Sequence, residues 1–144
     1  MIHEFGNVAD VLGLPGKEAA ARSPFGLMSR IEAGLPFGTL DRVAQLLAPG
    51  NVQFKYRLIP KATYERRKSA LRLSSDEGIR LARVARVWSL ALDVWHSEDE
   101  ARDFLFRAHP MLEDKRPIDV VLKNEIGAEL VLDILGGLKY GSAA

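Results

Sequence analysis

Apolar side chains recur three or four positions apart along most of the chain, as they do on one face of an amphipathic helix. No stretch of convincing length alternates between apolar and polar residues, as a half-buried strand does. The sequence therefore predicts an all-α protein. We expect two small helical domains, the first over residues 1–72 and the second over residues 73–144.

Polar caps, prolines and glycines mark where the helices of the first domain begin and end. The predicted helices span residues 24–33, 40–47, 52–57 and 60–69. Residues 1–23 are weakly patterned and interrupted by glycines and a proline. We therefore expect them to form a loosely attached arm, with no more than one helical turn after Asn7.

The second domain is predicted to begin with the longest helix of the chain. Ser74 and Glu77 have the spacing of a capping box, and the helix is expected to run to about Trp95. Its second half, residues 87–95, is apolar on nearly all sides, which is typical of a helix buried in a core or in an oligomer interface. We therefore expect a homodimer.

The end of the chain combines a helical stripe with a short tail. The stripe consists of Ala128, Val131, Leu132 and Leu135. Gly136-Gly137 is expected to end this helix, and residues 138–144 are too short to fold alone. Two interpretations stay open: a last helix packed on the core with Tyr140 covering it, or a tail that is presented to a partner.

The net charge of +1 hides a basic middle section. Residues 55–86 carry ten Lys and Arg against three acids, a balance of +7, whereas residues 87–144 have a balance of −5. A concentration of positive charge favours an anionic partner, and nucleic acid is the first candidate.

The two predicted helices at 52–57 and 60–69, joined by a tight turn, have the form of a helix-turn-helix. The candidate DNA-binding residues on the second helix are Lys61, Thr63, Tyr64, Arg66, Arg67 and Lys68. Glu65 is the only acid in that helix, so pairs within it cannot neutralise all the bases. The alternative is a charged face that is exposed to solvent and binds nothing.

Few side chains are suited to catalysis. The sequence has no cysteine, and no two of its three histidines have the i, i+4 spacing of a zinc site. No apolar run approaches the roughly 18 residues of a membrane span, and the first residues lack a signal-peptide pattern. We therefore expect a cytoplasmic protein that is not an enzyme, with no catalytic residue, no metal site and no membrane association.

Several motifs of the second half of the chain form a set. The most specific one closes the chain and comprises Glu125-Ile126-Gly127-Ala128, Val131, Leu135-Gly136 and Tyr140-Gly141. The earlier ones are Leu73–Glu77 with Arg83, Ala91–Trp95, Ala101–Leu105, His109–Leu112 and Arg116-Pro117. Residues 73–141 thereby resemble the C-terminal toxin-binding domain of the Xre/MbcA/ParS antitoxins, and Tyr64–Lys68 resembles the end of that family's helix-turn-helix region. At His96 and Asp114 the chain departs from the family, where glycine is usual.

This resemblance implies the antitoxin of a type II toxin–antitoxin pair. The usual partner is a RES-domain toxin, which destroys NAD⁺, and the antitoxin would obstruct its active site. The resemblance places Leu138, Lys139, Tyr140 and Gly141 at the toxin, while the helix-turn-helix would bind operator DNA and repress the shared operon. No cofactor is expected on this chain, because the NAD⁺ chemistry belongs to the partner. The alternative is a plain dimeric DNA-binding regulator without a toxin.

Overall fold

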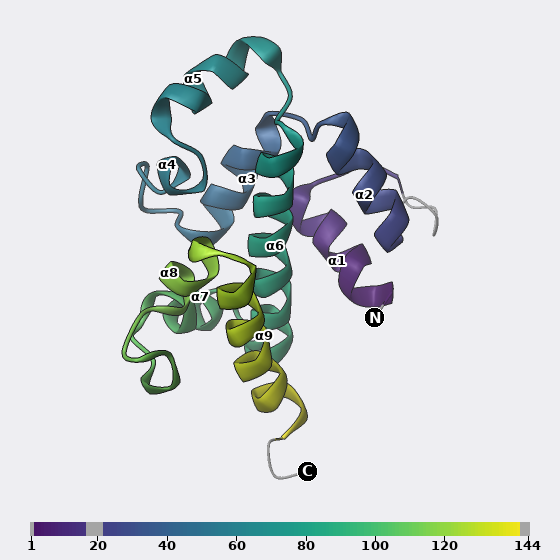
Figure 1. Cartoon of the computed structure of the whole chain (residues 1–144). Helices are drawn as coiled ribbons and strands as arrows, with labels where there is room; N and C mark the ends of the chain where they lie inside the picture. The colour runs from purple at the N-terminus through teal and green to yellow at the C-terminus, as the bar shows by residue number, and fades with distance from the viewer. Residues whose placement is uncertain (1, 17–21, 142–144) are drawn as a thin grey trace. The chain divides into compact units, whose positions relative to one another are not determined.

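The structure, a computed structural model, describes residues 2–16 and 22–141 (Figure 1). Within these ranges it contains α-helices, one 3-10 helix and no strand, which confirms the predicted all-α class. The contacts divide the chain into two units, residues 1–85 (unit 1) and 86–144 (unit 2). In its described parts no helix is long and apolar enough to cross a membrane.

Unit 1 contains five helices and the start of a sixth within the residues described. These are α1 (Ile2–Leu12), α2 (Pro24–Ala33), α3 (Gly38–Leu47), α4 (Lys55–Leu58), α5 (Lys61–Ala70) and the first turns of α6 (Ser75–Trp95). The prediction for residues 24–33 is confirmed to the residue, and the next three helices begin and end within three positions of their predicted bounds. Unit 2 contains the end of α6 and then α7 (Glu98–Phe106), the 3-10 helix η1 (Pro110–Leu112), α8 (Pro117–Lys123) and α9 (Glu125–Tyr140).

The prediction of a loosely attached N-terminal arm is wrong over residues 2–12. They form α1, which contacts α2 and α3 and buries Val8, Ala9 and Leu12. Arg42 of α3 donates hydrogen bonds to the carbonyl oxygens of Asp10 and Val11, at 3.0 and 2.9 Å. A side chain from a distant helix therefore satisfies carbonyls that the end of α1 leaves unpaired, and burial of one face outweighs the weak helical pattern.

The capping box at the start of α6 is confirmed. The Glu77 amide donates to Ser74 Oγ at 3.2 Å, and the Ser74 amide donates to Glu77 Oε1 at 2.7 Å. The turns that follow belong to unit 1, since Leu81, Val84 and Ala85 are buried and the contact boundary comes after residue 85. The contacts thus divide the chain inside α6, later than the boundary predicted after residue 72, because one continuous helix serves both units.

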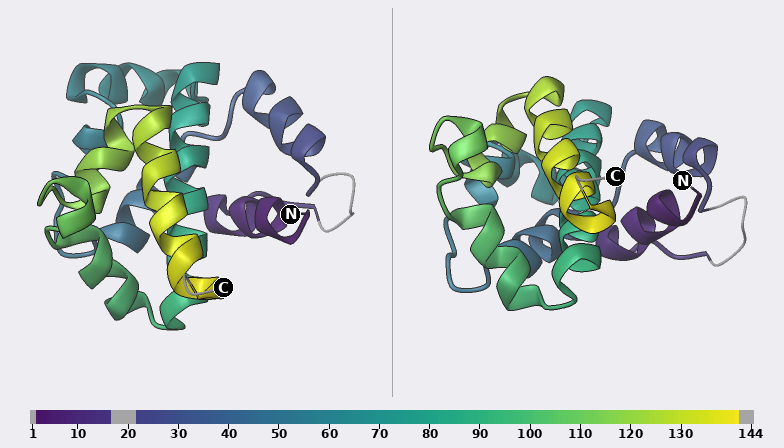
Figure 2. Two further views of the ribbon diagram at one scale, coloured as in Figure 1. Left: turned by 60° about the horizontal axis from the view of Figure 1, so that its bottom comes forward. Right: turned by 90° about the horizontal axis from the view of Figure 1, so that it is seen from below.

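Unit 2 is built around α9, which runs beside the second half of α6 in every view (Figures 1 and 2). Ion pairs join the two helices, from Arg86 to Glu129 at 3.3 Å and from Lys139 to Asp93 at 3.2 Å. At its other end, α9 approaches α8 so closely that a Cβ atom on Gly127 would overlap the carbonyl oxygen of Val120. The glycine of the closing motif is therefore required by the packing of α9 on α8.

The predicted end of the last helix at Gly136-Gly137 is wrong. The helix α9 continues to Tyr140, and Gly141 ends it with φ +82° and an amide hydrogen bond to the carbonyl of Gly137. Two glycines cost a helix about 1 kcal/mol each relative to alanine, and the ion pair from Lys139 to α6 supports the turn that follows them. The part of the predicted tail at residues 138–140 is thus helical, and residues 142–144 lie outside the described part of the chain.

Candidate functional site

The basic helix α5 is held in unit 1 by the turn that precedes it and by the loop that follows it. Leu58 and Ile59, before the helix, are buried, and the amide of Tyr64 donates to the carbonyl of Pro60 at 2.9 Å. After the helix, Leu71 has φ +65°, and its carbonyl accepts from the Phe37 amide at 3.0 Å. Both ends of α5 are thereby fixed to the core of unit 1.

Tyr64, predicted to contact DNA, instead faces the interior of unit 1. Its side chain is only 4% exposed, and its ring packs against Phe37 and Tyr56 with centroid distances of 4.9 and 5.5 Å. Its hydroxyl donates to the Asp41 carboxylate at 3.0 Å and accepts from Lys55 Nζ at 3.3 Å. Tyr64 therefore anchors α5 to α3 and α4, and its side chain is not available to a nucleic acid.

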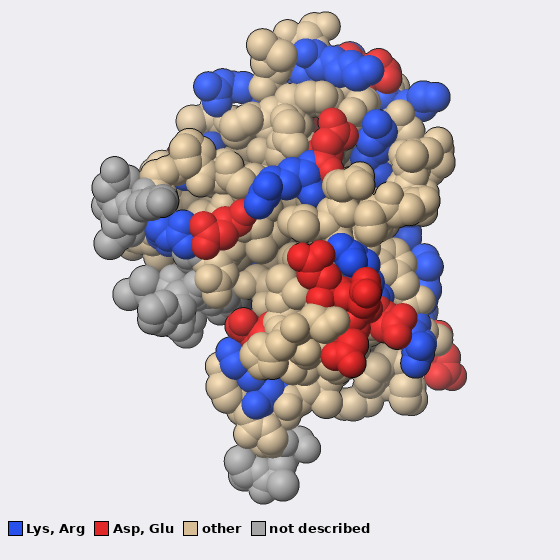
Figure 3. Space-filling model, turned by 180° about the vertical axis from the view of Figure 1, so that it is seen from behind, with Lys and Arg blue, Asp and Glu red and all other residues tan. Residues whose placement is uncertain are grey.

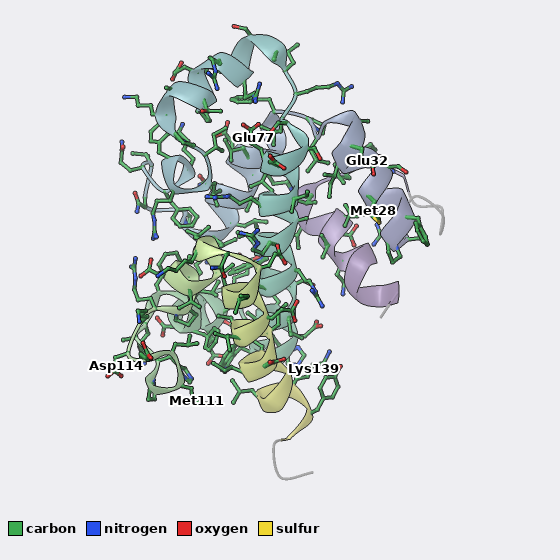
Figure 4. All side chains as sticks on the ribbon, in the orientation of Figure 1. Met28, Glu32, Glu77, Met111, Asp114 and Lys139 are labelled. Atoms are coloured by element: carbon green, nitrogen blue, oxygen red, sulfur yellow. The ribbon has the colours of Figure 1, made fainter. Side chains whose placement is uncertain are left out.

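Arg67, also predicted to contact DNA, pairs with the start of α6. Its Nε donates to Glu77 Oε1 at 2.9 Å. Figure 4 labels Glu77, which lies in the first turn of α6. Partial burial alone would raise the pKa of Glu77, but the hydrogen bonds from Arg67 and from Ser74, together with the charge of Arg67, outweigh burial and hold the pKa below its ordinary value. The bridge connects the end of α5 to the capping box of α6, so Arg67 has a structural role within unit 1.

The other bases of α5 point outward. Lys61, Arg66 and Lys68 are exposed, and Thr63 is half-buried. Figure 3 shows Lys and Arg side chains gathered over α5, at the top of the view. Glu65 pairs with Lys68 at 3.3 Å, an exposed contact that contributes little and leaves the surface predominantly basic. This outward set, Lys61, Thr63, Arg66 and Lys68, is called the α5 surface below.

The last turn of α9 presents most of its predicted partner-binding residues to solvent. Leu138 is 54% and Tyr140 is 73% exposed, and Gly141 is exposed as well. Lys139, which is labelled in Figure 4, donates to Asp93 Oδ2 at 3.2 Å, and this hydrogen bond raises the pKa of the Lys139 amine. The structure thus agrees with neither of the two interpretations in full, because residues 138–140 are helical and anchored by Lys139 while the Tyr140 side chain remains largely exposed.

A cavity of about 430 Å³ adjoins this turn. Its lining includes Leu138 from α9, Trp95 from α6, Phe104 from α7 and His109 before η1. The rings of Trp95 and Phe104 lie 4.9 Å apart between centroids. The end of α9 is therefore bordered by an aromatic wall, and sequence reasoning, which treated Trp95 as a core residue, missed it.

The two departures from the family pattern fall on left-handed backbone. His96 has φ +53° and Asp114 has φ +62°. Glycine adopts such angles without a steric penalty, which is a physical reason for its usual presence at these positions. The chain keeps both loop conformations despite the substitutions.

In the ranges that the structure describes, no three His, Asp or Glu side chains are grouped so that they could hold a metal ion. The features that stand out are instead two separate surfaces suited to macromolecular contact, the basic α5 surface and the exposed last turn of α9.

Two family models match the sequence, one over each surface. Residues 26–86 match the antitoxin Xre-like helix-turn-helix domain, and residues 90–141 match the antitoxin Xre/MbcA/ParS C-terminal toxin-binding domain. The first model includes residues 73–86, which the sequence analysis assigned to the second domain. No curated protein matches the sequence.

Proposed function

Because the chain belongs to the Xre/MbcA/ParS antitoxins, which are not enzymes, we propose that it neutralises a RES-type, NAD⁺-degrading toxin and represses the operon that encodes them both. Its helix-turn-helix domain would bind operator DNA, and its C-terminal domain would cover the active site of the toxin. The observation that carries the proposal is the exposed last turn of α9, which ends the matched toxin-binding domain.

The contact with the toxin is proposed to centre on Leu138, Tyr140 and Gly141. An exposed tyrosine beside an exposed leucine provides a large contact area at a low cost in side-chain entropy, and tyrosine is enriched among residues that dominate binding energy. Lys139 is proposed to assist by anchoring the turn to Asp93, and a toxin carboxylate that displaces Asp93 would recruit it directly.

The experiment is to co-express the chain with the protein encoded beside it and to measure growth, cellular NAD⁺ and complex formation. We expect the partner alone to stop growth and deplete NAD⁺, and the chain to restore both in a complex that purifies intact. Rescue without a change in NAD⁺ would keep the antitoxin function and contradict the RES class.

The role of the last turn is tested with a matched pair of variants on the same helix. Tyr140 and Ile126 are both 73% exposed, one at each end of α9. We expect Tyr140→Ala to weaken toxin binding by about thirtyfold, the effect of losing one dominant interface residue, and Ile126→Ala to have little effect. Equal effects of the two variants, measured by calorimetric titration, would contradict the proposed contact.

Operator binding is proposed to use the α5 surface, and the symmetry of operators favours a homodimer. Replacing Lys61, Arg66 and Lys68 by Gln should strongly lower the affinity for operator DNA. The plot of log affinity against log salt concentration should also become less steep, by about one unit of slope for each phosphate that is no longer neutralised. The matched control is Arg107→Gln, which removes one exposed positive charge of unit 2. If these α5 variants leave the salt dependence of DNA affinity unchanged, the α5 surface is not the site that binds operator DNA.

The alternative, a dimeric DNA-binding regulator without a toxin, is supported by the same basic helix. It differs in one outcome, since the chain would then bind DNA with a salt-dependent affinity but form no complex with a neighbouring gene product and rescue no growth.

A further inference from the structure

Unit 1 contains a cavity of about 290 Å³ on the side of α2 that faces the loop after α5. Its walls are mainly apolar and include Leu14, Pro15, Leu35 and Pro36, and they are completed by two arginines, Arg30 and Arg72. A concave apolar site with a few polar groups is typical of small-molecule binding sites, which begin at about 300 Å³.

Arg30 carries the polar group that the fold leaves unsatisfied. Among the residues that the structure describes, its Nη1 is the buried side-chain nitrogen that has no hydrogen-bond partner. A buried donor of a charged group without an acceptor costs free energy, so such groups in folded proteins are normally paired with protein, water or a ligand. The missing partner of Arg30 is an acceptor, and because the guanidinium is always charged, an anionic one is favoured.

The opposite wall of the cavity is rigid and holds the second guanidinium in place. Arg72 Nη1 donates to the carbonyl of Gly34 at 2.8 Å, and a bridge pairs Pro36 with Arg72. The Leu73 amide donates to the carbonyl of Leu35 at 2.9 Å. These bonds join the loop after α2 to the loop after α5, so this wall of the cavity is preformed and the Arg72 guanidinium is held without a ligand.

We propose that this cavity binds a small monocarboxylic acid with a short hydrocarbon body. The carboxylate accepts from the guanidinium of Arg30, with Arg72 beside it, because planar forks of N–H donors match carboxylate oxygens. The hydrocarbon body lies against Leu14, Pro15, Leu35 and Pro36. Inorganic phosphate fits this lining less well, because it offers nothing to the apolar walls and its charge is costly to remove from water.

The test is a titration of the chain, without DNA or toxin, with hexanoate, the neutral isostere hexanamide and inorganic phosphate at equal ionic strength. Calorimetry measures affinity, and backbone amide shifts of residues 33–35 locate the binding. We expect hexanoate to bind at least about tenfold more tightly than the other two, since hexanamide cannot form the charge-assisted hydrogen bond and phosphate cannot pack on the apolar walls.

Two variants separate the charge of the site from its volume. Arg30→Gln should weaken hexanoate about tenfold, and Ala33→Leu, which fills the cavity from an exposed position of α2 without changing charge, should abolish binding. The control Lys61→Gln removes a charge outside the cavity and should leave affinity unchanged. Ala33→Leu keeps the test decisive if Arg30→Gln alters folding.

Three results would overturn the proposal. Equal binding of hexanoate and hexanamide would show that the carboxylate charge is not recognised. If Lys61→Gln weakens hexanoate binding as much as Arg30→Gln does, the effect is a general electrostatic attraction and not a contact in the cavity. N-acetylglutamate amide, which carries the carboxylate of a protein side chain, should bind weakly. If it binds as tightly as hexanoate, the occupant is a protein side chain and the small-molecule assignment is wrong.

Discussion

The α5 helix of unit 1 and the last turn of α9 in unit 2 were both predicted to bind partners, yet the fold uses their residues differently. On α5, Tyr64 is buried and Arg67 is bonded to Glu77, so two of six predicted contact residues hold the unit together. On α9, Leu138 and Tyr140 remain exposed, while the Lys139 side chain donates a hydrogen bond to Asp93 of the same unit.

The difference shows how far residue type can identify a binding surface. Arginine, lysine and tyrosine suit both phosphate contact and internal hydrogen bonding, so a basic helix mixes the two roles. The end of α9 carries a leucine and a tyrosine that both remain more than half exposed, which is a clearer mark of a partner.

The largest effect that tests this contrast is expected at Tyr64. Tyr64→Ala should lower the free energy of unfolding by about 3–5 kcal/mol, because it removes a buried ring together with its hydrogen bonds to Asp41 and Lys55. Urea unfolding measures this change. The control Arg66→Ala, on the exposed side of the same helix, should change stability by less than about 0.5 kcal/mol. If the Tyr64→Ala variant keeps its stability and loses only DNA affinity, Tyr64 contacts the partner directly, and α5 and the last turn of α9 then do not differ in how they use their predicted contact residues.

The next effect separates the two ends of α9. Gly127→Ala should cost about 1–3 kcal/mol, because the added methyl group overlaps the Val120 carbonyl and forces α8 and α9 apart. Gly136→Ala should instead add about 0.5–1 kcal/mol, since no described atom lies within 4 Å of the new Cβ and alanine favours the helix. Thermal unfolding compares the two. A destabilisation at Gly136 similar to that at Gly127 would show that both ends are packed.

A smaller effect tests whether Arg67 is structural. Glu77→Gln should cost about 1 kcal/mol at neutral pH, because the charge that holds Arg67 is removed while a capping oxygen remains. Because the pKa of Glu77 is lowered in the folded state, its contribution is present above the ordinary value of 4.5 and lost as the pH falls through the folded value. The difference between the two proteins in urea unfolding should therefore disappear in acid. A difference that persists there would contradict the ion pair.

The smallest effect concerns the two loop residues of unit 2. His96→Gly and Asp114→Gly should each change stability by only about 0.5 kcal/mol in the stabilising direction, because relief of the left-handed backbone is partly offset by the entropy that glycine adds to the unfolded chain. Glu100→Gly, within α7, should lower stability by about 1 kcal/mol and serves as the control. Destabilisation at both loop positions would mean that the native side chains contribute more than their backbone angles cost.

Most of the helices could be predicted because their signals are local. The Ser74–Glu77 capping box and the stripe of α9 depend on residues three or four positions apart, and so do the caps at the starts of α2 and α7, where Ser23 accepts from the Gly26 amide and Ser97 from the Glu100 amide. The closing motif, Glu125 to Gly141, could also be identified from the sequence alone, and its match to the toxin-binding domain confirms the family.

The tertiary structure decided what depends on distant residues. Helix α1 forms despite a weak pattern because Arg42 and the core of unit 1 hold it, and α9 passes its two glycines with the support of an ion pair to Asp93. Spacing along the chain carries no information about such contacts.

The sequence by itself therefore determined the helical class, the caps and the family, because each of them depends on residues that are close together along the chain. Only the tertiary structure decided that Tyr64 and Arg67 hold α5 in place, that Tyr140 stays exposed at the end of a helix, and that Arg30, whose buried Nη1 has no partner, lines the same cavity as Arg72. The physical reason is that burial and hydrogen bonding belong to pairs of groups that the fold brings together from different helices.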